Sequence, residues 1–270
     1  DPHEEGAPML ECQQRQEARN ADGARRLASV MNRWEIEAMR ALSKADLNEQ
    51  RKHSGRPVAN AVLFRGSGVA KKLPGFHEKF GFHAAAIAGG ALYKGVAKAV
   101  GMDFIEVEGA NGMPNTNLEG KFEAAVHALG THDFVFLHIK ATDYFSHNKN
   151  ALGKSRFISK VDENLCLIPS DLLRTLSVIL TGDHTTPCDR GMHSGEPVPL
   201  LLASPGIRRD DTKVFSERQA ASGALGRING TDVMKIILDA TERTVELGTR
   251  PSPKNVTFIP KGLKPLIFEL

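Results

Sequence analysis

Carboxylate and imidazole side chains follow two strongly apolar segments of this sequence. The segments are residues 134–139 and 176–180, and both are rich in Val, Ile, Leu or Phe. Apolar runs of this length, bounded by polar residues, predict buried β-strands. Each predicted strand therefore ends in side chains that can bind a metal ion or move a proton. These side chains are Asp143, His147, Asp183, His184 and His193.

The chemistry that these residue types favour is metal binding. In open α/β sheets, ligands bind beyond the carboxyl ends of the strands, so we expect the five side chains to converge. Mixed nitrogen and oxygen ligands suit Mn²⁺ or Zn²⁺ better than Ca²⁺. Taken singly, an Asp after a strand is more often a helix N-cap, and a His there is usually an ordinary hydrogen-bonded side chain. The combination favours a metal site.

The spacing within each pair sets a geometric requirement. Asp143 and His147 are separated by one turn of helix or by a tight loop. Asp183 and His184 are adjacent, and neighbours on an extended chain point to opposite sides, so these two need a bend to act together.

The composition excludes several classes of partner. The chain has 270 residues, of which 41% are hydrophobic and 25% charged, as in ordinary globular proteins. The net charge is +3 without a block of Lys and Arg, which argues against nucleic acid. No apolar run approaches the ~18 residues of a membrane span.

The 3 cysteines form no CxxC motif, which predicts reduced thiols and a cytoplasmic location. The start at Asp1, without Met or a signal region, reads as a cut or processed end.

Elements alternate along most of the chain. A long amphipathic helix is predicted over 21–43, a basic loop over 48–57 and a strand over 59–64. After Pro74 and Gly75, strand-like and helical runs alternate, which predicts an α/β fold with a buried, mostly parallel sheet. The predicted strands are 83–88, 103–107, 134–139, 176–180 and 199–203, and the predicted helices are 91–100, 118–129, 154–167 and 231–245. The role of the Pro-containing tail, 251–270, is left open.

Two motifs make the sequence recognisable. "HIKATDYFSHNKNALGKSRFISKVDE" and "LTGDHTTPCDRGMHSGEPVPLLLASPG" resemble the metal-binding segments of cofactor-independent phosphoglycerate mutases, of the archaeal-type branch of the alkaline phosphatase superfamily. "GALGRINGTDVMKIILDA" resembles the C-terminal helix of that family. The resemblance covers about residues 1–247. It implies an alkaline-phosphatase-like three-layer domain over 73–270, and the remainder of a smaller, inserted α+β substrate-clamping domain over 1–72.

The resemblance also implies the roles of the site residues. Asp143, His147 and His193 would hold one divalent ion, and Asp183 and His184 a second. Manganese is expected, with zinc, cobalt or magnesium as alternatives. Lys79 matches a family lysine near the transferred phosphate and Arg65 a substrate-binding arginine, with ordinary surface charge as the less favoured alternative for both. The implied substrate is a small phosphorylated three-carbon acid.

The implied reaction interconverts 2- and 3-phosphoglycerate in glycolysis and gluconeogenesis through a phosphorylated serine. In the family this Ser and a further metal-binding Asp belong to the N-terminal part. No Ser in this sequence matches the nucleophile, and this includes Ser67, which lies in a Gly-rich stretch. We therefore expect this chain alone to have negligible mutase activity and to lack a central strand.

Three explanations stay open for this difference. The chain is part of a longer enzyme, or it is completed by a second chain, or it is a non-catalytic structural subunit. Another mutase, such as a phosphopentomutase, or a phosphatase of the same superfamily is the alternative activity. Two smaller departures are Asn148, where the family often has Asp, and Cys188, which we interpret as a bystander.

Overall fold

The computed structural model describes residues 8–64, 66, 68–69, 71–245 and 250–251. By its contacts, the chain divides into two compact units, Asp1–Lys71 and Lys72–Leu270. This division falls one residue before the predicted boundary; the functions predicted for the two parts stay predictions. Most of the tail, residues 252–270, lies outside the described residues.

The first unit is built on one long helix. Helix α1 spans Ala21–Ser43, as predicted, and its Asn20 cap accepts a hydrogen bond from the amide of Gly23. Trp34, which is 49% exposed, packs against Phe64 with their ring centroids 5.0 Å apart.

Two predictions for this unit are wrong. Residues 48–57 are not a loop throughout, because helix α2 spans Asp46–His53, with Asp46 and Glu49 in its first turn and basic residues in its last. This distribution of charge favours a helix through the helix dipole. Residues 59–64 form no strand. Among the described residues of this unit there is no second strand to pair with, and an isolated strand is not stable.

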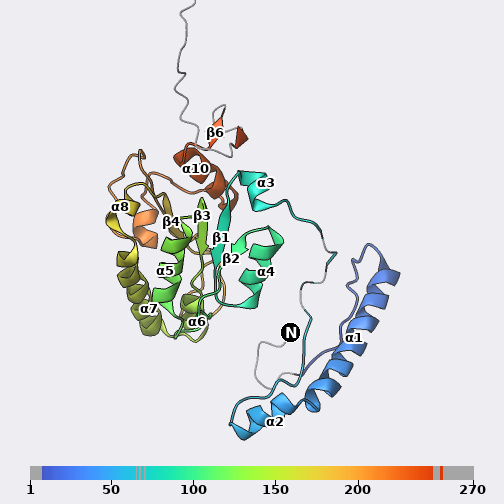
Figure 1. Cartoon of the computed structure of the whole chain (residues 1–270). Coiled ribbons are helices and arrows are strands. Elements are labelled where there is room, and N and C mark those ends of the chain that lie inside the picture. Colours follow the sequence, from blue (N-terminus) through green and yellow to red (C-terminus); the bar gives the residue numbers. More distant parts are fainter. Residues whose placement is uncertain (1–7, 65, 67, 70, 246–249, 252–270) are drawn as a thin grey trace, which may run out of the picture. The chain divides into compact units, whose positions relative to one another are not determined.

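A parallel sheet forms the centre of the second unit. Its order is β2-β1-β3, in which β1 (Ala84–Ile87) pairs in parallel with β2 (Asp103–Phe104) and β3 (Phe134–Leu137). Helix α4 (Ala91–Ala99) lies on one side of this sheet and α5 (Leu118–Ala128) on the other (Figure 1). Because β1 is covered on both faces and paired at both edges, all of its residues are buried. The predicted α/β class with a mostly parallel sheet is confirmed.

A second ladder carries the other apolar run. Strand β4 (Val178–Thr181) pairs antiparallel with β5 (Leu200–Ala203). In the described residues, β3 and β4 are each an edge strand of their own sheet. Both nevertheless contribute to one core, because Phe134 of β3 and Ile179 of β4 pack against a buried cluster of Phe82, Ile237 and Leu238.

The remaining elements surround these sheets. The prediction of one helix over 231–245 is wrong at its end, because α10 stops at Ala240 and β6 pairs with β7 instead. None of the helices in the described ranges is long and apolar enough to cross a membrane. The elements are α3 (Phe76–Phe80), α6 (Ala141–His147), α7 (Ala151–Asn164), η1 (Leu165–Leu167), α8 (Ser170–Leu173), α9 (Glu217–Ala220), η2 (Gly230–Asp232), α10 (Val233–Ala240), β6 (Thr244–Val245) and β7 (Arg250–Pro251).

A second apolar cluster fixes helix α6, which follows β3. Ala141 at the start of α6 is buried with Leu118 of α5 and Phe157 of α7, and Phe145 packs against them. The opposite side of α6 is thereby left to carry polar groups.

Helix α7 begins with a tightly packed glycine. The side chain of Asn150 caps the helix by accepting a hydrogen bond from the amide of Gly153 at 2.8 Å. A Cβ atom at Gly153 would lie 2.6 Å from two ring carbons of Phe145, which is closer than real Cβ contacts. Only glycine therefore lets the cap and the aromatic ring meet here.

This contact reverses the usual effect of replacing a helical glycine. We expect Gly153→Ala to lower the free energy of unfolding by about 1–3 kcal/mol through overpacking. The matched control is Gly95→Ala in α4, where an added Cβ would meet nothing within 4 Å. That control should raise stability by about 0.5–1 kcal/mol. Urea unfolding measures both, and stabilisation by Gly153→Ala would contradict the packing described.

Candidate metal centre

Helix α6 presents a carboxylate and an imidazole one turn apart. Asp143 lies in its first turn and His147 is its last residue. The Nε2 atom of His147 is 3.2 Å from Oδ1 of Asp143, whose side chain is only 18% exposed. The spacing predicted from the sequence thus becomes a helical i, i+4 pair.

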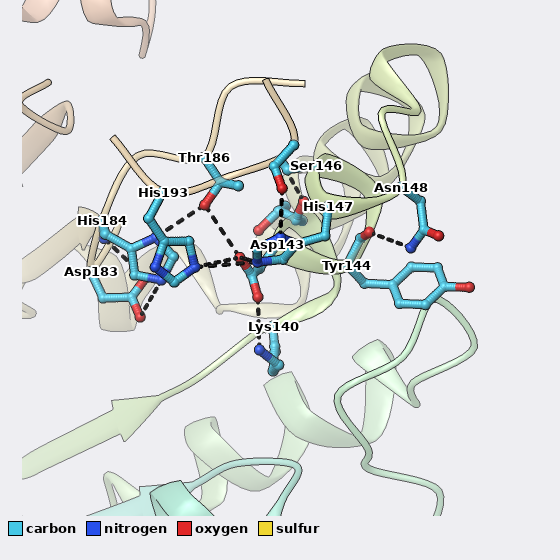
Figure 2. A network of polar contacts seen from close by, with 12 residues as sticks. Lys140, Asp143, Tyr144, Ser146, His147, Asn148, Asp183, His184, Thr186 and His193 are labelled. Carbon is cyan, nitrogen blue, oxygen red and sulfur yellow. Dashed lines mark hydrogen bonds and ion pairs between the residues drawn. The ribbon is translucent and has the colours of Figure 1, made fainter. Parts of the chain in front are cut away.

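The loop after β4 contributes two further imidazoles. An isolated β-bridge between Thr185 and Ser194 folds this loop back on itself. His193 is thereby placed against His184, with ring centroids 3.8 Å apart. The Nε2 atom of His193 lies 3.7 Å from Oδ1 of Asp143 (Figure 2).

A backbone carbonyl fixes the hydrogen on His147. Nδ1 of His147 is 2.9 Å from the carbonyl oxygen of Gly191, and because that oxygen can only accept, Nδ1 must donate. In the neutral ring, Nε2 then carries the lone pair, and it lies 3.2 Å from Nε2 of His193. Gly191 has a φ of +69°, a conformation that favours glycine. The turn therefore orients the imidazole for a cation.

Thr186 performs the same task for His184. Its side chain is buried, and its hydroxyl lies 3.3 Å from Oδ1 of Asp143 and 3.1 Å from Nδ1 of His184. Because the carboxylate can only accept, the hydroxyl donates to Asp143 and accepts from His184. The Nε2 lone pair of His184 is left for another partner. Hydrogen bonds of this kind set the tautomer and orientation of metal-binding histidines.

Lys140 supplies the charge that balances Asp143. Its Nζ atom is 2.8 Å from Oδ2 of Asp143. Burial would raise the pKa of Asp143, but the hydrogen bond and charge of Lys140 outweigh it and hold that pKa below its ordinary value. The same hydrogen bond raises the pKa of Lys140. Sequence reasoning missed Lys140, although its position three residues before Asp143 was a usable signal.

His138 lies beside this group but differs from it. Its ring stacks on Tyr93 with centroids 3.6 Å apart, and its Nδ1 atom has no hydrogen-bond partner among the described residues. Burial lowers the pKa of His138 to about 4, so the ring is neutral near pH 7. It adds no positive charge beside Lys140.

The donor set fits a divalent cation. One ligand atom each from Asp143, His184 and His193 lie within 4.8 Å of one another, and His147 flanks them. Asp183 lies at the exposed edge, with its Oδ2 atom 3.6 Å from Nε2 of His184. The structure thus brings the five predicted side chains together. Its tightest group joins His184 to Asp143 and His193, whereas the resemblance assigns His184 to the other ion.

The comparison with protein families agrees with this donor set. A family model described as "Metalloenzyme superfamily" matches residues 14–240. The chain belongs to the metalloenzyme superfamily. Within this superfamily the resemblance to archaeal cofactor-independent phosphoglycerate mutases is confirmed. The alkaline-phosphatase-like fold expected from the sequence agrees with this membership.

Curated relatives in this superfamily share much of the sequence. The 2,3-bisphosphoglycerate-independent phosphoglycerate mutase of Pyrococcus horikoshii is 40% identical over 250 residues, which are 92% of this chain and 60% of that protein. The 2,3-bisphosphoglycerate-independent phosphoglycerate mutase 1 of Methanocaldococcus jannaschii is 39% identical over 249 residues, which are 92% of this chain and 60% of that protein. This chain therefore spans about 60% of the length of the curated relatives that it matches.

Solved structures of relatives support the fold of this superfamily member. A Pyrococcus horikoshii protein matches with a TM-score of 0.74 and 40% identity, over 83% of this chain and 59% of that one. The cofactor-independent phosphoglycerate mutase of Thermoplasma acidophilum matches with a TM-score of 0.55 and 32% identity, over 88% of this chain and 57% of that one.

Of the two predicted substrate-binding residues, the structure describes only Lys79, which is not part of the cluster described for this metalloenzyme. Lys79 lies on α3, where its Nζ is 5.0 Å from the ring centroid of Phe80. Helix α3 packs through Phe76 and Phe80 near Phe82 and Phe134, where β1 and β3 begin, whereas Asp143 follows the end of β3. Arg65 lies outside the described residues.

The role of Thr186 gives a test of the site that needs no metal. We expect Thr186→Val to lower the free energy of unfolding by about 1–3 kcal/mol, because two polar partners lose their bond. The ring of His184 should also change from one tautomer, with the hydrogen on Nδ1, to a mixture. Thr186→Ser keeps the hydroxyl and is the control. Nitrogen NMR of the imidazoles checks the tautomer, and an unchanged His184 in Thr186→Val would contradict the hydrogen-bond assignment.

Proposed function

We propose that this chain is the metal-binding part of a cofactor-independent phosphoglycerate mutase. The observation that carries the proposal is the gathering of carboxylates and oriented imidazoles after β3 and β4, in a segment that resembles named mutases of this kind. The chain spans 60% of the Pyrococcus horikoshii relative, and we propose that the nucleophilic serine belongs to the part that it does not cover.

The five predicted ligand side chains of this chain would hold two divalent ions. Asp143, His147 and His193 are proposed for one ion, and Asp183 and His184 for the other. We expect manganese, with zinc, cobalt or magnesium as alternatives, since the donors are imidazole nitrogens and carboxylate oxygens. When bound, such ions polarise a phosphoryl group and lower the pKa of an attacking hydroxyl.

The protein's own contribution is orientation and charge. Gly191 and Thr186 fix where the hydrogens of His147 and His184 lie, so the Nε2 lone pair of His147 is left toward His193 and that of His184 toward Asp183. Lys140 keeps the pKa of Asp143 low, so that this carboxylate stays ionised near pH 7. A site prepared in this way need not reorganise when it receives an anionic substrate.

The proposed reaction moves the phosphoryl group between 2- and 3-phosphoglycerate. A serine hydroxyl, from the part of the relatives that this chain does not cover, would attack phosphorus while the bond to the glycerate oxygen breaks. The other glycerate hydroxyl would then attack the phosphorus of the phosphoserine while the bond to the serine oxygen breaks, which regenerates the serine hydroxyl. Arg65 and Lys79 remain proposed substrate-binding residues. The first unit remains the proposed remainder of a substrate-clamping domain.

The proposed setting is the cytoplasm, where glycolysis takes place. The cysteines Cys12, Cys166 and Cys188 are all free thiols, as a reducing compartment permits.

Metal titration tests the ligand assignment. We expect the chain to bind Mn²⁺ or Zn²⁺ in calorimetry, and His147→Ala or Asp183→Ala to weaken binding at their respective sites by at least about tenfold. His53→Ala, an exposed histidine of α2, is the matched control and should change nothing. Failure of the wild-type chain to hold any of these ions would favour a structural subunit.

Product analysis tests the reaction. We expect the 270-residue chain alone to leave 3-phosphoglycerate unchanged in phosphorus NMR. Joined to the uncovered part of the Pyrococcus horikoshii relative, it should form 2-phosphoglycerate. Release of inorganic phosphate would point to a phosphatase instead. Rapid turnover by the chain alone would show that its nucleophile lies within these residues.

A further inference from the structure

The two oxygens of Asp143 are divided between opposite sides of the carboxylate. Oδ1 faces the hydroxyl of Thr186 at 3.3 Å and Nε2 of His147 at 3.2 Å. Oδ2 faces Nζ of Lys140 at 2.8 Å, and Figure 2 shows Lys140 approaching from the side away from the imidazoles. Only one oxygen is therefore presented to the candidate metal centre.

The path of the Lys140 side chain is set by packing. Although this side chain is 41% exposed, its stem runs directly over Gly112. A Cβ atom at Gly112 would lie 3.2 Å from Cδ and 3.7 Å from Cβ of Lys140. Glycine at this position lets the stem lie flat on the backbone and aims the ammonium group at Asp143.

A buried lysine holds the two backbone segments that form this path. Lys121 of α5 is fully buried, and its Nζ lies 3.1 Å from the carbonyl oxygen of His138 and 3.4 Å from that of Asn111. His138 lies two residues before Lys140, and Asn111 directly precedes Gly112. The loop and the end of β3 are thus tied together beneath the stem.

We propose that Lys140 is a positioning residue that selects the bound ion by restricting Asp143 to one coordinating oxygen. The inference rests on the proposed metal centre and adds a basis for its ion preference. With Oδ2 engaged by an ammonium group, Asp143 binds through Oδ1 alone.

One-oxygen binding favours small ions over calcium. Ca²⁺ takes six to eight oxygen ligands and gains from carboxylates that bind through both oxygens. Zn²⁺ binds in a nearly tetrahedral geometry to imidazoles and a single carboxylate oxygen. Freeing Oδ2 should therefore strengthen the binding of Ca²⁺. It should weaken the binding of Zn²⁺, because Asp143 can then turn away from the geometry that Zn²⁺ needs.

A role of Lys140 through its charge alone and a role in positioning Asp143 predict different metal affinities when Lys140 is replaced. Loss of a nearby positive charge alone would strengthen the binding of Zn²⁺ and Ca²⁺ by similar factors. Loss of positioning changes the ratio of the two affinities. Lys149→Met, at an exposed lysine that makes no hydrogen bond or ion pair with Asp143 in the described structure, removes the same charge and calibrates the first effect.

The experiment measures dissociation constants for Zn²⁺ and Ca²⁺ with the full 270-residue chain. In Lys140→Met we expect the preference for Zn²⁺ over Ca²⁺ to fall by about tenfold or more, as for other partners of metal ligands. Gly112→Val keeps the charge but displaces the stem, and it should shift the ratio in the same direction. Lys140→Arg retains a charged donor and should keep the ratio within about threefold. Thermal melts in the absence of metal verify that each variant is folded.

Two results would overturn the proposal. One is a ratio in Lys140→Met that equals the wild-type ratio, with both affinities changed alike as in Lys149→Met. The other is a crystal structure of metal-free Lys140→Met in which the Asp143 carboxylate has not moved from Thr186 and His147. That structure decides the positioning role even if the wild-type chain binds neither ion, a result that would count against the proposed function instead.

Discussion

The carboxylate of Asp143 is the constraint on which the candidate centre depends. It is mostly buried, and a buried charge is tolerated only with close partners. Lys140 and the hydroxyl of Thr186 supply these partners from two separate segments of the chain. The helix that carries Asp143 is itself anchored by Ala141 in an apolar cluster. Apolar packing on one side of α6 therefore determines electrostatics on the other.

Much of the candidate centre was predictable because the local sequence determines where its side chains lie along the strands. Apolar runs at 134–139 and 176–180 predicted strands, and the residues after them were of metal-binding types. The grouping of His184 with His193 was not predictable, since it depends on the bridge between Thr185 and Ser194. Long-range pairing of this kind has no signature in the spacing of residues.

The errors elsewhere have different origins. Residues 59–64 have a strand-like composition, but a strand needs a partner, and the described part of the first unit provides none. Residues 48–57 look basic and loop-like, yet the distribution of charge along α2 is suited to a helix. Lys140 and Thr186 were missed because neither belongs to a recognised metal-ligand pattern. The spacing of Lys140 from Asp143 was a signal for their contact, but which oxygen of Asp143 each residue meets follows only from the structure.

The contact between His147 and the carbonyl of Gly191 has a consequence for how this region can diverge. A main-chain oxygen is present whatever side chains surround it, so neighbouring loop residues can be exchanged without altering the imidazole. The glycine itself cannot be exchanged so freely, because its φ of +69° is strained for other residues and an added Cβ would lie 3.2 Å from the carbonyl oxygen of His147. Among relatives, replacement of the residues directly beside this glycine, Arg190 and Met192, is thus a poor sign that the centre has been lost, whereas replacement of the glycine itself is an informative one.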